Sequence, residues 1–364
     1  FRTIHLYLSL ISGLFIMTAC FTGAILVFEQ ELQHAIYPDR YYSKEVKEVQ
    51  VPIAKALDNL RRSSPDLKIS AVKLYADPKR NIEVSVTKEG SQQVKKGESA
   101  KMTAFIDPYT GSLIEVYVYG ESFFYTVMSL HRWLLADDTG KLIMGVSMLM
   151  FIFILISGLI LWWPKTKVIL KQRTSIKWKA SWKRVAQDLH HALGIYTVMF
   201  LFIFAFTSLV WSFQWFNDGI YTITNSSKEP IKPPSSLINN EVVRTSIDNI
   251  LADAFVRVPN AVFYNIALPK DSSGVYAVNI LNRGAAHENA SDHYYYDQYS
   301  GQFLKKVAFA DRPLGQRVRA TVKPIHVSSI YGLPTKILGF FVCLFGATFP
   351  ITGVIMWLSR LKKI

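Results

Sequence analysis

Four long runs of apolar residues, separated by polar stretches, dominate the pattern of the chain. They cover about residues 4–28, 142–163, 192–216 and 337–358. Each run is long enough to cross a hydrocarbon core of roughly 30 Å as a helix, which satisfies its own backbone hydrogen bonds in lipid. The first run leads into Glu29 without a small-residue cleavage site. It therefore predicts an anchored helix and not a signal peptide.

The two long stretches between these runs have the alternating pattern of small α+β domains. A helical pattern over residues 53–62 precedes four strand patterns, and a helical pattern over residues 247–256 precedes four more. The expected strands cover 69–75, 82–87, 102–106 and 113–119 in the first stretch, and 262–268, 275–281, 293–296 and 303–309 in the second. A polar tract over residues 90–99 predicts a hairpin loop, and a proline-rich segment over 228–236 predicts a stiff linker.

A matching turn lies between the last two expected strands of each set. It reads Asp-Pro-Tyr-Thr-Gly from Asp107 and Asp-Gln-Tyr-Ser-Gly from Asp297. Aspartate opens such turns by accepting hydrogen bonds from the backbone, and glycine supplies the positive φ that the turn requires. We therefore expect hairpin turns here, with a catalytic aspartate as the lesser alternative.

Histidines recur at fixed positions relative to the apolar runs. His5 and His190 each open a run, and a threonine follows each of them after seventeen residues. His131 and His326 precede the other two runs, and each is followed by a glycine after 27 residues and a tryptophan after 31. The residues at these repeated positions are Thr22 and Thr207, Gly158 and Gly353, and Trp162 and Trp357. The spacing indicates two copies of one half.

Charge gives the orientation. The chain has 364 residues, of which half are hydrophobic, and a formal net charge of +14. Basic residues gather between the second and third runs, where residues 164–187 contain Lys and Arg but no acid. The positive-inside rule places this linker and both termini in the cytoplasm and the two long stretches outside. Anionic lipid accounts for much of the basic charge, and we find no nucleic-acid recognition motif beside it.

We therefore predict a membrane α-helical protein with four transmembrane helices in two repeated halves and two extracytoplasmic α+β domains. The expected segments are 1–28, 121–163, 188–216 and 321–364 for the four helices with their histidine-bearing segments, 29–120 and 217–320 for the outer domains, and 164–187 for the cytoplasmic linker.

Two histidines are expected on each side of the bilayer. Imidazole near a membrane is costly and usually functional, and two helices that each give one histidine supply the axial ligands of a six-coordinate haem iron. Covalent attachment is excluded because the chain has no Cys-x-x-Cys-His, and its cysteines, Cys20 and Cys343, lie inside the runs. Two other roles for the histidines fit less well than haem binding. A zinc or non-haem iron site would normally include acidic or cysteine ligands. A proton relay would normally use intramembrane carboxylates, which these runs lack.

Other charged or metal-binding residues lie near these histidines. His191 is the alternative to His190, although Leu6 stands at its counterpart beside His5. Arg132 lies next to His131, where its charge would bind haem propionates or an acidic ligand, or reach the membrane interface as a snorkelling cation. The same alternatives apply to Arg317, Arg319 and Lys323. We expect His34, His287 and His293 to be surface residues or iron-side contacts.

These motifs together resemble the PepSY-associated transmembrane family, which includes iron-regulated inner-membrane proteins and ferric-siderophore reductases. The resemblance rests on Leu-His-Arg-Trp-Leu-Leu from Leu130, Asp-Leu-His-His-Ala-Leu-Gly from Asp188, Ile-His at 325–326, Ser-Gly-Leu-Ile-Leu-Trp-Trp-Pro from Ser157 and the two aspartate turns. It covers essentially the whole chain. His191 is a departure, because the family more often has arginine there.

The resemblance implies an inner membrane protein of bacteria with two periplasmic PepSY domains and two haems b. By position, His5, His131, His190 and His326 would be the iron ligands. The implied reaction is one-electron reduction of a periplasmic ferric siderophore or other ferric chelate, which releases Fe(II). Because no Gly-x-Gly-x-x-Gly follows a strand, the electron donor is expected to be a separate cytoplasmic or membrane partner.

Two other classes stay open at this point. One is a non-redox PepSY membrane protein that binds or regulates a partner, in which the histidines only hydrogen-bond between helices; it predicts a colourless protein. The other is a metal transporter whose histidines line a path through the membrane. It predicts metal flux without redox activity.

Overall fold

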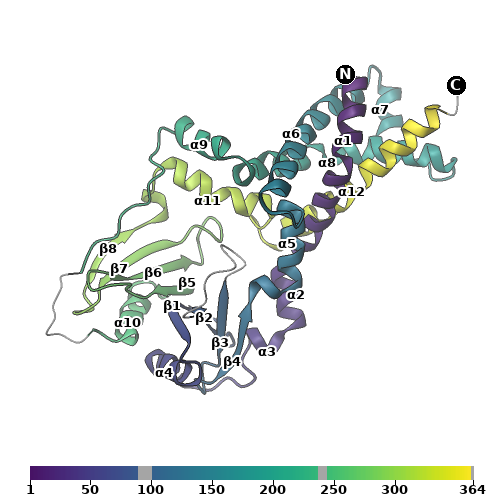
Figure 1. Cartoon of the computed structure of the whole chain (residues 1–364). Coiled ribbons are helices and arrows are strands. Elements are labelled where there is room, and N and C mark those ends of the chain that lie inside the picture. Colours follow the sequence, from purple (N-terminus) through teal and green to yellow (C-terminus); the bar gives the residue numbers. More distant parts are fainter. Residues whose placement is uncertain (89–100, 237–243, 362–364) are drawn as a thin grey trace. The chain divides into compact units, whose positions relative to one another are not determined.

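The computed structural model describes residues 1–88, 101–236 and 244–361, which form two compact units. One unit comprises residues 1–29, 126–224 and 321–364, and the other comprises 30–125 and 225–320. Figure 1 shows the whole chain. The hairpin loop expected at residues 90–99 lies outside the described residues. Since the chain passes between the units repeatedly, each unit is assembled from segments far apart in the sequence.

Four long helices form the first unit. They are α1 (Arg2–Val27), α6 (Asp137–Trp162), α8 (Trp182–Ser212) and α12 (Leu333–Leu361). All four are long and apolar enough to cross a membrane, which confirms the four predicted spans. Helices α1 and α8 each pack against both α6 and α12. The four helices therefore surround one common interior.

The helix boundaries differ from the hydropathy pattern at the third span. Helix α8 begins at Trp182, ten residues before the expected run, because its basic and polar first turns continue the same helix. It ends where Phe213 adopts an extended backbone with φ −127° and ψ 123°, and a separate helix α9 (Gln214–Ile223) follows. The basic linker also forms a short helix, α7 (Lys167–Arg173). Hydropathy marked only the apolar part of these elements.

Small residues let the helices approach closely. A Cβ added to Gly346 of α12 would lie 2.9 Å from Sγ of Cys20 on α1, so a larger residue at 346 would push the two helices apart. Both Cys20 and Cys343 are free thiols in the buried core of the bundle. They pack as small apolar groups, as the sequence predicts.

Two helices lead into α6 and α12. They are α5 (Phe123–Trp133) and α11 (Leu314–His326), and each is followed by a tight turn. Leu134, Leu135 and Asp137 all have positive φ in the turn after α5, while Ser328 and Gly332 do so after α11. Non-glycine residues in this region carry strain of order 1 kcal/mol each, which surrounding packing must hold. The turns fix the histidines at the ends of α5 and α11.

The second unit is built on one antiparallel sheet. Its strand order is β4-β3-β2-β1-β5-β6-β7-β8. The strands are β1 (Leu67–Tyr75), β2 (Ile82–Lys88), β3 (Met102–Ile106), β4 (Leu113–Val118), β5 (Ala261–Ala267), β6 (Val275–Asn282), β7 (Asp292–Asp297) and β8 (Phe303–Val307). The sequence predicts two separate α+β domains, but β1 pairs with β5, so both stretches contribute to a single sheet and a single unit.

Helices α4 (Ile53–Ser63) and α10 (Ile247–Arg257) supply the apolar core of this sheet. Their side chains pack against alternate strand residues such as Val72 and Ile266, which are fully buried. Asp248 of α10 accepts hydrogen bonds from the backbone nitrogens of Ile53 and Ala54, which ties the start of α4 to α10. Shorter helices, α2 (Glu29–Ile36) and α3 (Pro38–Tyr41), precede the sheet.

The two aspartate turns have the predicted structural role. Oδ1 of Asp107 accepts hydrogen bonds from the backbone of Tyr109 and Thr110, and Oδ1 of Asp297 accepts the equivalent pair from Tyr299 and Ser300. The glycines that close the turns, at 111 and 301, have φ of +68° and +72°. Burial alone would raise the pKa of both carboxyls. Hydrogen bonds outweigh it and lower the pKa: those from the Ser43 hydroxyl and the turn backbone at Asp107, and those from the turn backbone and Ser236 at Asp297.

Candidate functional site

The four repeated histidines form two pairs in the helix bundle. His5 on α1 and His190 on α8 line one cavity between the helices. His131, near the end of α5, and His326, at the end of α11, face each other with ring centres 6.2 Å apart. We call these the inner pair and the outer pair. Each pair takes one histidine from each half of the chain.

The two pairs lie at opposite ends of the bundle. Helix α1 carries His5 near its start and Thr22, which contacts His131, near its end. Helix α8 carries His190 and, further on, Thr207, which contacts His326. Seventeen residues of α-helix rise about 25 Å. The bundle therefore holds the two pairs at two depths, about one hydrocarbon core apart.

The inner pair lines a cavity of about 440 Å³. Such a volume lies within the range of about 300–1,000 Å³ that is typical of cofactor and ligand sites. Most of its lining is apolar, from all four long helices, and the polar lining includes His191 and the arginines Arg2, Arg173 and Arg360. The lining contains no Asp or Glu. This is a cavity for a largely apolar ligand with anionic groups.

Every histidine of the two pairs makes the same contact with a hydroxyl group. In each case Nδ1 lies at hydrogen-bond distance from a serine or threonine on a facing helix. The pairs are His5 with Ser157 at 3.0 Å, His131 with Thr22 at 2.9 Å, His190 with Thr352 at 2.8 Å and His326 with Thr207 at 2.9 Å. The sequence repeat includes Thr22 and Thr207 as landmarks, but their role as histidine partners emerges only from the fold.

The hydrogen bonds of these hydroxyls fix the histidine tautomer. Each hydroxyl also lies near a carbonyl of the preceding turn of its own helix; for example, Thr22 Oγ1 donates to Thr18 O at 2.6 Å and Thr207 Oγ1 to Ile203 O at 2.6 Å. A hydroxyl has one hydrogen. At Ser157, Thr22 and Thr207 a carbonyl is the closer partner, so that hydrogen is used within the helix and the oxygen accepts from the imidazole, whose Nδ1 carries the proton. We assign the same tautomer to His190, although the carbonyls of Thr348 and Phe349 lie 3.1 Å from the Thr352 hydroxyl and Nδ1 lies at 2.8 Å.

The second ring nitrogen is consequently free to act as a ligand. A neutral imidazole with a proton on Nδ1 has its lone pair on Nε2, the form in which histidine binds a metal. In the described part of the chain, Nε2 of these four residues makes no hydrogen bond. Metal-binding histidines commonly donate their other N–H to an oxygen in this way, which orients the ring.

Glycines next to the hydroxyl residues make room for the rings. A Cβ on Gly158 would lie 3.1 Å from Cε1 of His5, and one on Gly23 would lie 3.3 Å from Cε1 of His131. These separations are tighter than ordinary carbon contacts. Of the two glycines at repeated positions, Gly158 therefore packs closely against its histidine, whereas a Cβ on Gly353 would lie at an ordinary 3.8 Å from Cε1 of His190.

The outer pair is enclosed more tightly than the inner pair. His131 also donates to the backbone oxygen of Ala19 at 3.0 Å, and the ring centre of Trp211 lies 5.2 Å from that of His326. Burial, with a smaller contribution from the charge of Arg132, lowers the pKa of His131 to about 4, and burial together with the neighbouring His131 lowers that of His326 to about 3. Both rings are neutral at pH 7 and able to act as ligands.

The spacing of the outer pair is compatible with two imidazole ligands of one metal. A metal binds an imidazole nitrogen at about 2 Å, so the ring centres of two such ligands can lie about 6 Å apart, and those of His131 and His326 lie 6.2 Å apart with their ring planes inclined at 59°. Among the described residues, no group of three or more His, Cys, Asp or Glu is placed to hold a metal ion. Haem iron needs only two protein ligands, because the macrocycle provides the rest. The residues present therefore fit haem better than a bare ion.

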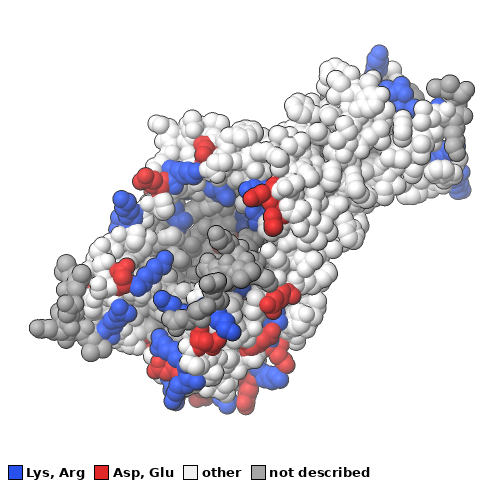
Figure 2. Space-filling view, in the orientation of Figure 1, with Lys and Arg blue, Asp and Glu red and all other residues white. Residues whose placement is uncertain are grey.

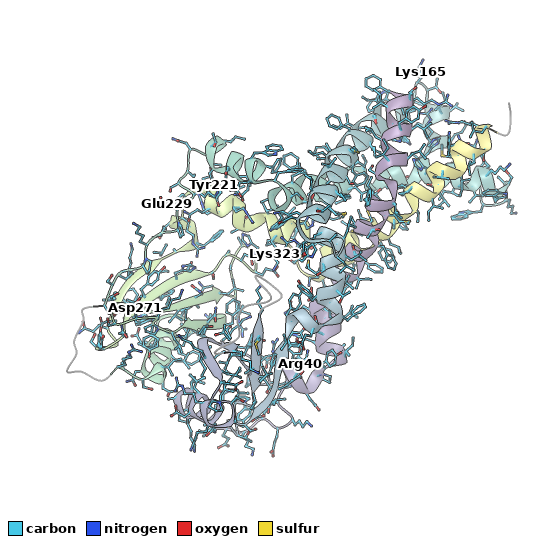
Figure 3. The ribbon with its side chains drawn as sticks, viewed as in Figure 1. Arg40, Lys165, Tyr221, Glu229, Asp271 and Lys323 are labelled. Carbon is cyan, nitrogen blue, oxygen red and sulfur yellow. The ribbon has the colours of Figure 1, made fainter. Side chains whose placement is uncertain are left out.

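The charged residues of the bundle are unevenly distributed along its length. Its flank, in the view of Figure 2, has few charged side chains, while basic residues gather at the end where α1 begins. Lys165 of the basic linker lies at this end, as Figure 3 shows. The inner pair thus lies towards the basic end of the bundle, and the outer pair lies towards the other end.

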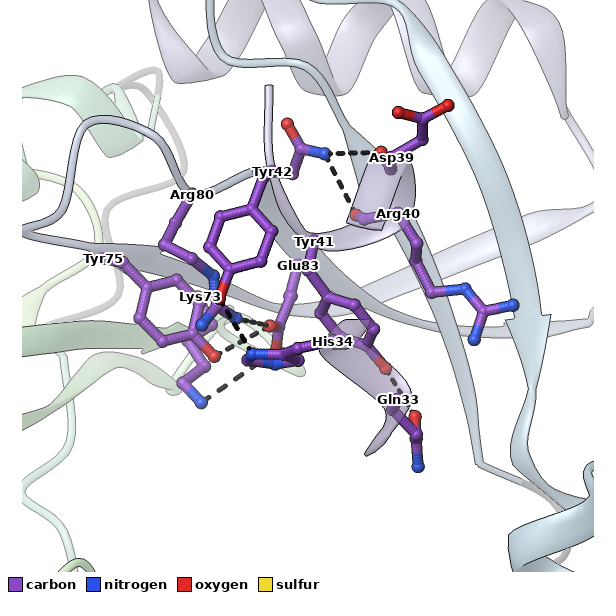
Figure 4. A network of polar contacts seen from close by, with 11 residues as sticks. Gln33, His34, Asp39, Arg40, Tyr41, Tyr42, Lys73, Tyr75, Arg80 and Glu83 are labelled. Carbon is purple, nitrogen blue, oxygen red and sulfur yellow. Dashed lines mark hydrogen bonds and ion pairs between the residues drawn. The ribbon is translucent and has the colours of Figure 1, made fainter. Parts of the chain in front are cut away.

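Other predicted candidates have structural contacts. His34 belongs to the polar network of the sheet unit drawn in Figure 4, where its Nδ1 lies 3.0 Å from Tyr42 Oη and its ring packs on Tyr41. In the same network, Arg80 stacks on Tyr75 and pairs with Glu83. The network joins α2 and α3 to β1 and β2. None of these contacts points to iron binding.

Of four remaining candidates, two belong to the sheet unit and two to the helical unit. His287 is buried, with 8% of its surface exposed, so its prediction as a surface residue is wrong; its Nδ1 accepts from the backbone of Asn289, and it packs on Phe309. His293 is half-buried on β7, where burial lowers its pKa to about 4. Lys323 lies on α11, one turn before His326 (Figure 3). Arg132 stacks on Trp133.

Comparison with known proteins gives one result that covers the chain. A family model described as the PepSY-associated TM region matches residues 2–360. No curated protein matches the chain.

Proposed function

This chain belongs to the PepSY-associated transmembrane family, and on that premise we propose that it is a di-haem b oxidoreductase of the bacterial inner membrane. Electrons would pass from the cytoplasmic side to a ferric siderophore or other ferric chelate in the periplasm. The four helices would form two repeated halves, with both termini in the cytoplasm and the sheet unit in the periplasm. The basic end of the bundle, which holds the inner pair, supports this orientation.

One observation carries the proposal. Four histidines at duplicated positions each present an Nε2 with its lone pair, and each is held by a hydroxyl at Nδ1. Histidines that served only to join helices would need the Nδ1 contact alone. They would not need to occur as two pairs, one towards each end of the bundle.

The residues of the chain would each contribute a defined part. His5 and His190 would hold one haem in the inner cavity, and His131 and His326 would hold the other. When bound, haem would supply one-electron oxidation and reduction at its iron. The apolar lining of the inner cavity excludes water and lowers the local dielectric constant, and the hydroxyl contacts orient the rings and increase their basicity as ligands.

His190 is favoured over His191 as the inner ligand. Thr352 contacts Nδ1 of His190 in the same way as Ser157 contacts that of His5, whereas no hydroxyl of the described residues hydrogen-bonds to His191. His191 also lines the cavity, with its ring centre 6.4 Å from that of His190. Its place near the three arginines suits contact with anionic groups.

The acceptor would receive one electron at a time. Reduction of the bound Fe(III) to Fe(II) lowers its charge and weakens its hold on hard oxygen ligands, so the iron is released. The donor would be a separate protein or membrane carrier, because the chain has no dinucleotide-binding motif.

Haem content of single variants tests the proposal. We expect His131→Ala and His326→Ala each to lose one of two haems per chain, and His5→Ala and His190→Ala to lose the other. His287→Ala is the matched control, since it removes a buried histidine from the sheet unit. If all four variants kept the haem content of the control, the ligand assignment would be wrong.

Electron delivery is tested separately. The reduced protein, mixed rapidly with a ferric hydroxamate in the presence of a ferrous chelator, should be reoxidised as the ferrous complex forms in equal amount. A protein that keeps its haem but is not reoxidised would contradict the reductase proposal and leave haem binding intact.

A further inference from the structure

Three arginines line the inner cavity. Arg2 of α1, Arg173 of α7 and Arg360 of α12 all line the cavity, although they come from three separate elements. The cavity lining has no carboxylate to balance them. Guanidinium groups that converge without an acid repel one another, and a bound anion would relieve this repulsion.

The hydrogen bonds of the three arginines differ. Nη1 of Arg173 donates to the carbonyl oxygens of Leu161, at 3.1 Å, and Trp162, so Arg173 is fixed at the end of α6. Arg2 and Arg360 make no ion pair with a carboxylate within residues 1–88, 101–236 and 244–361. Their guanidinium groups are therefore available to a ligand, and Arg173 is held in place to join them.

A buried donor in the same lining points independently to a ligand. Nε1 of Trp162 is buried and has no hydrogen-bond acceptor in the described part of the chain. An indole nitrogen can only donate, and buried donors in native proteins are nearly always paired. Trp162 lines the cavity together with Trp357, its counterpart in the sequence repeat. The missing acceptor is consistent with an oxygen atom of a bound molecule.

We infer that Arg2, Arg360 and Trp162, supported by Arg173, bind the carboxylates of the ligand in the inner cavity. This inference rests on the proposed function, under which those carboxylates are the two propionates of haem. Arginine binds carboxylates through paired N–H groups, and Trp162 adds a neutral donor. The site would fix which edge of the macrocycle faces the basic end of the bundle.

Binding of two related porphyrins tests this inference. The full chain, prepared without haem in nanodiscs of neutral lipid, would be titrated with haemin and with haemin dimethyl ester, which has no free carboxylates. The variants are Arg2→Gln, Arg360→Gln and Trp162→Phe. Lys171→Gln is the matched control, because it removes an exposed charge from α7 that does not line the cavity. Arg173 is left intact, since its loss would also disturb the end of α6.

Each of the three variants should bind haemin roughly tenfold more weakly at one of its two sites, the loss of one hydrogen bond to a charged group. All proteins should bind the dimethyl ester alike, and the control should match the wild type with both ligands. Equal loss of haemin and ester, or no loss of either, would overturn the inference. Failure of the wild type to bind either porphyrin would instead overturn the proposed function.

A lipid headgroup is the other source of an anion at this position. Repeating the titrations in nanodiscs that contain phosphatidylglycerol distinguishes lipid phosphate from haem carboxylate. If the arginines bind lipid phosphate, anionic lipid should strengthen porphyrin binding to the wild type equally for haemin and its ester, and the variants should lose this effect. That result would overturn the carboxylate assignment.

Discussion

Replacement of Thr352 by valine removes one hydroxyl group and almost nothing else. Valine has nearly the shape of threonine, so the packing of α12 is retained. The hydroxyl lies 2.8 Å from Nδ1 of His190, and no other hydrogen bond to that nitrogen occurs among the described residues. The substitution therefore leaves a buried N–H without its acceptor.

The cost of this change follows from the contact. A hydrogen bond contributes about 0.5–1.5 kcal/mol net, and a buried donor left without an acceptor costs about 1–3 kcal/mol. Since the ring is also free to rotate, we expect haem to bind the inner site about 5- to 150-fold more weakly. The reduction potential of that haem should also change, because the ring loses a contact that increases its basicity.

Thr348→Val is the control for this experiment. Thr348 lies one turn earlier on α12, and its hydroxyl donates to Phe345 O of its own helix at 2.7 Å. Both variants would be made in a His326→Ala background, in which only the inner site is expected to bind haem. Transfer of haem to an excess of apomyoglobin gives the dissociation rate. Equal rates and equal potentials for the two variants would refute the role assigned to Thr352.

Three further predictions concern single residues. Gly158→Ala should weaken inner haem binding more than Gly353→Ala, because the added Cβ would lie 3.1 Å from His5 but 3.8 Å from His190; equal haem dissociation rates would contradict this. Asp297→Ala should lower the free energy of unfolding by about 1–3 kcal/mol at pH 7, through loss of its turn hydrogen bonds. These bonds lower the Asp297 pKa. Their contribution to stability should therefore be present above about pH 4 and lost as the pH falls through the pKa of the folded state. If the stabilities of variant and wild type became equal as the pH was raised, and not as it was lowered, the prediction would be wrong. His191→Ala should retain two haems per chain, and loss of one would identify His191 as the ligand.

Much of the fold was accessible from local patterns. The strands of the sheet unit match their predicted ranges within two residues at each end, because alternation of apolar and polar residues is a local property. The pairing of β1 with β5 was not accessible, since Ala71 and Ala267 meet across almost two hundred residues and nothing local specifies their partner. The predicted range of α8 was too short for a related reason, because hydropathy does not detect helical turns made of polar residues.

The candidate site was accessible only in part. Repeated spacing selected His5, His131, His190 and His326, and the fold brings them into two pairs. Their hydroxyl partners Ser157 and Thr352 immediately precede the repeated glycines in the sequence, so a search for polar residues at repeated positions would have found them. The arginines of the inner cavity have no such repeat. They come together because α1 begins, and α7 and α12 end, at the same end of the bundle.

Haem content of the purified chain tests the central claim most directly. The measurement is an absorption spectrum of the detergent-purified protein, before and after dithionite, with haem quantified per chain. Two histidine pairs predict a sharp reduced spectrum of b type and close to two haems per chain. A colourless protein that also takes up no added haem would contradict the account.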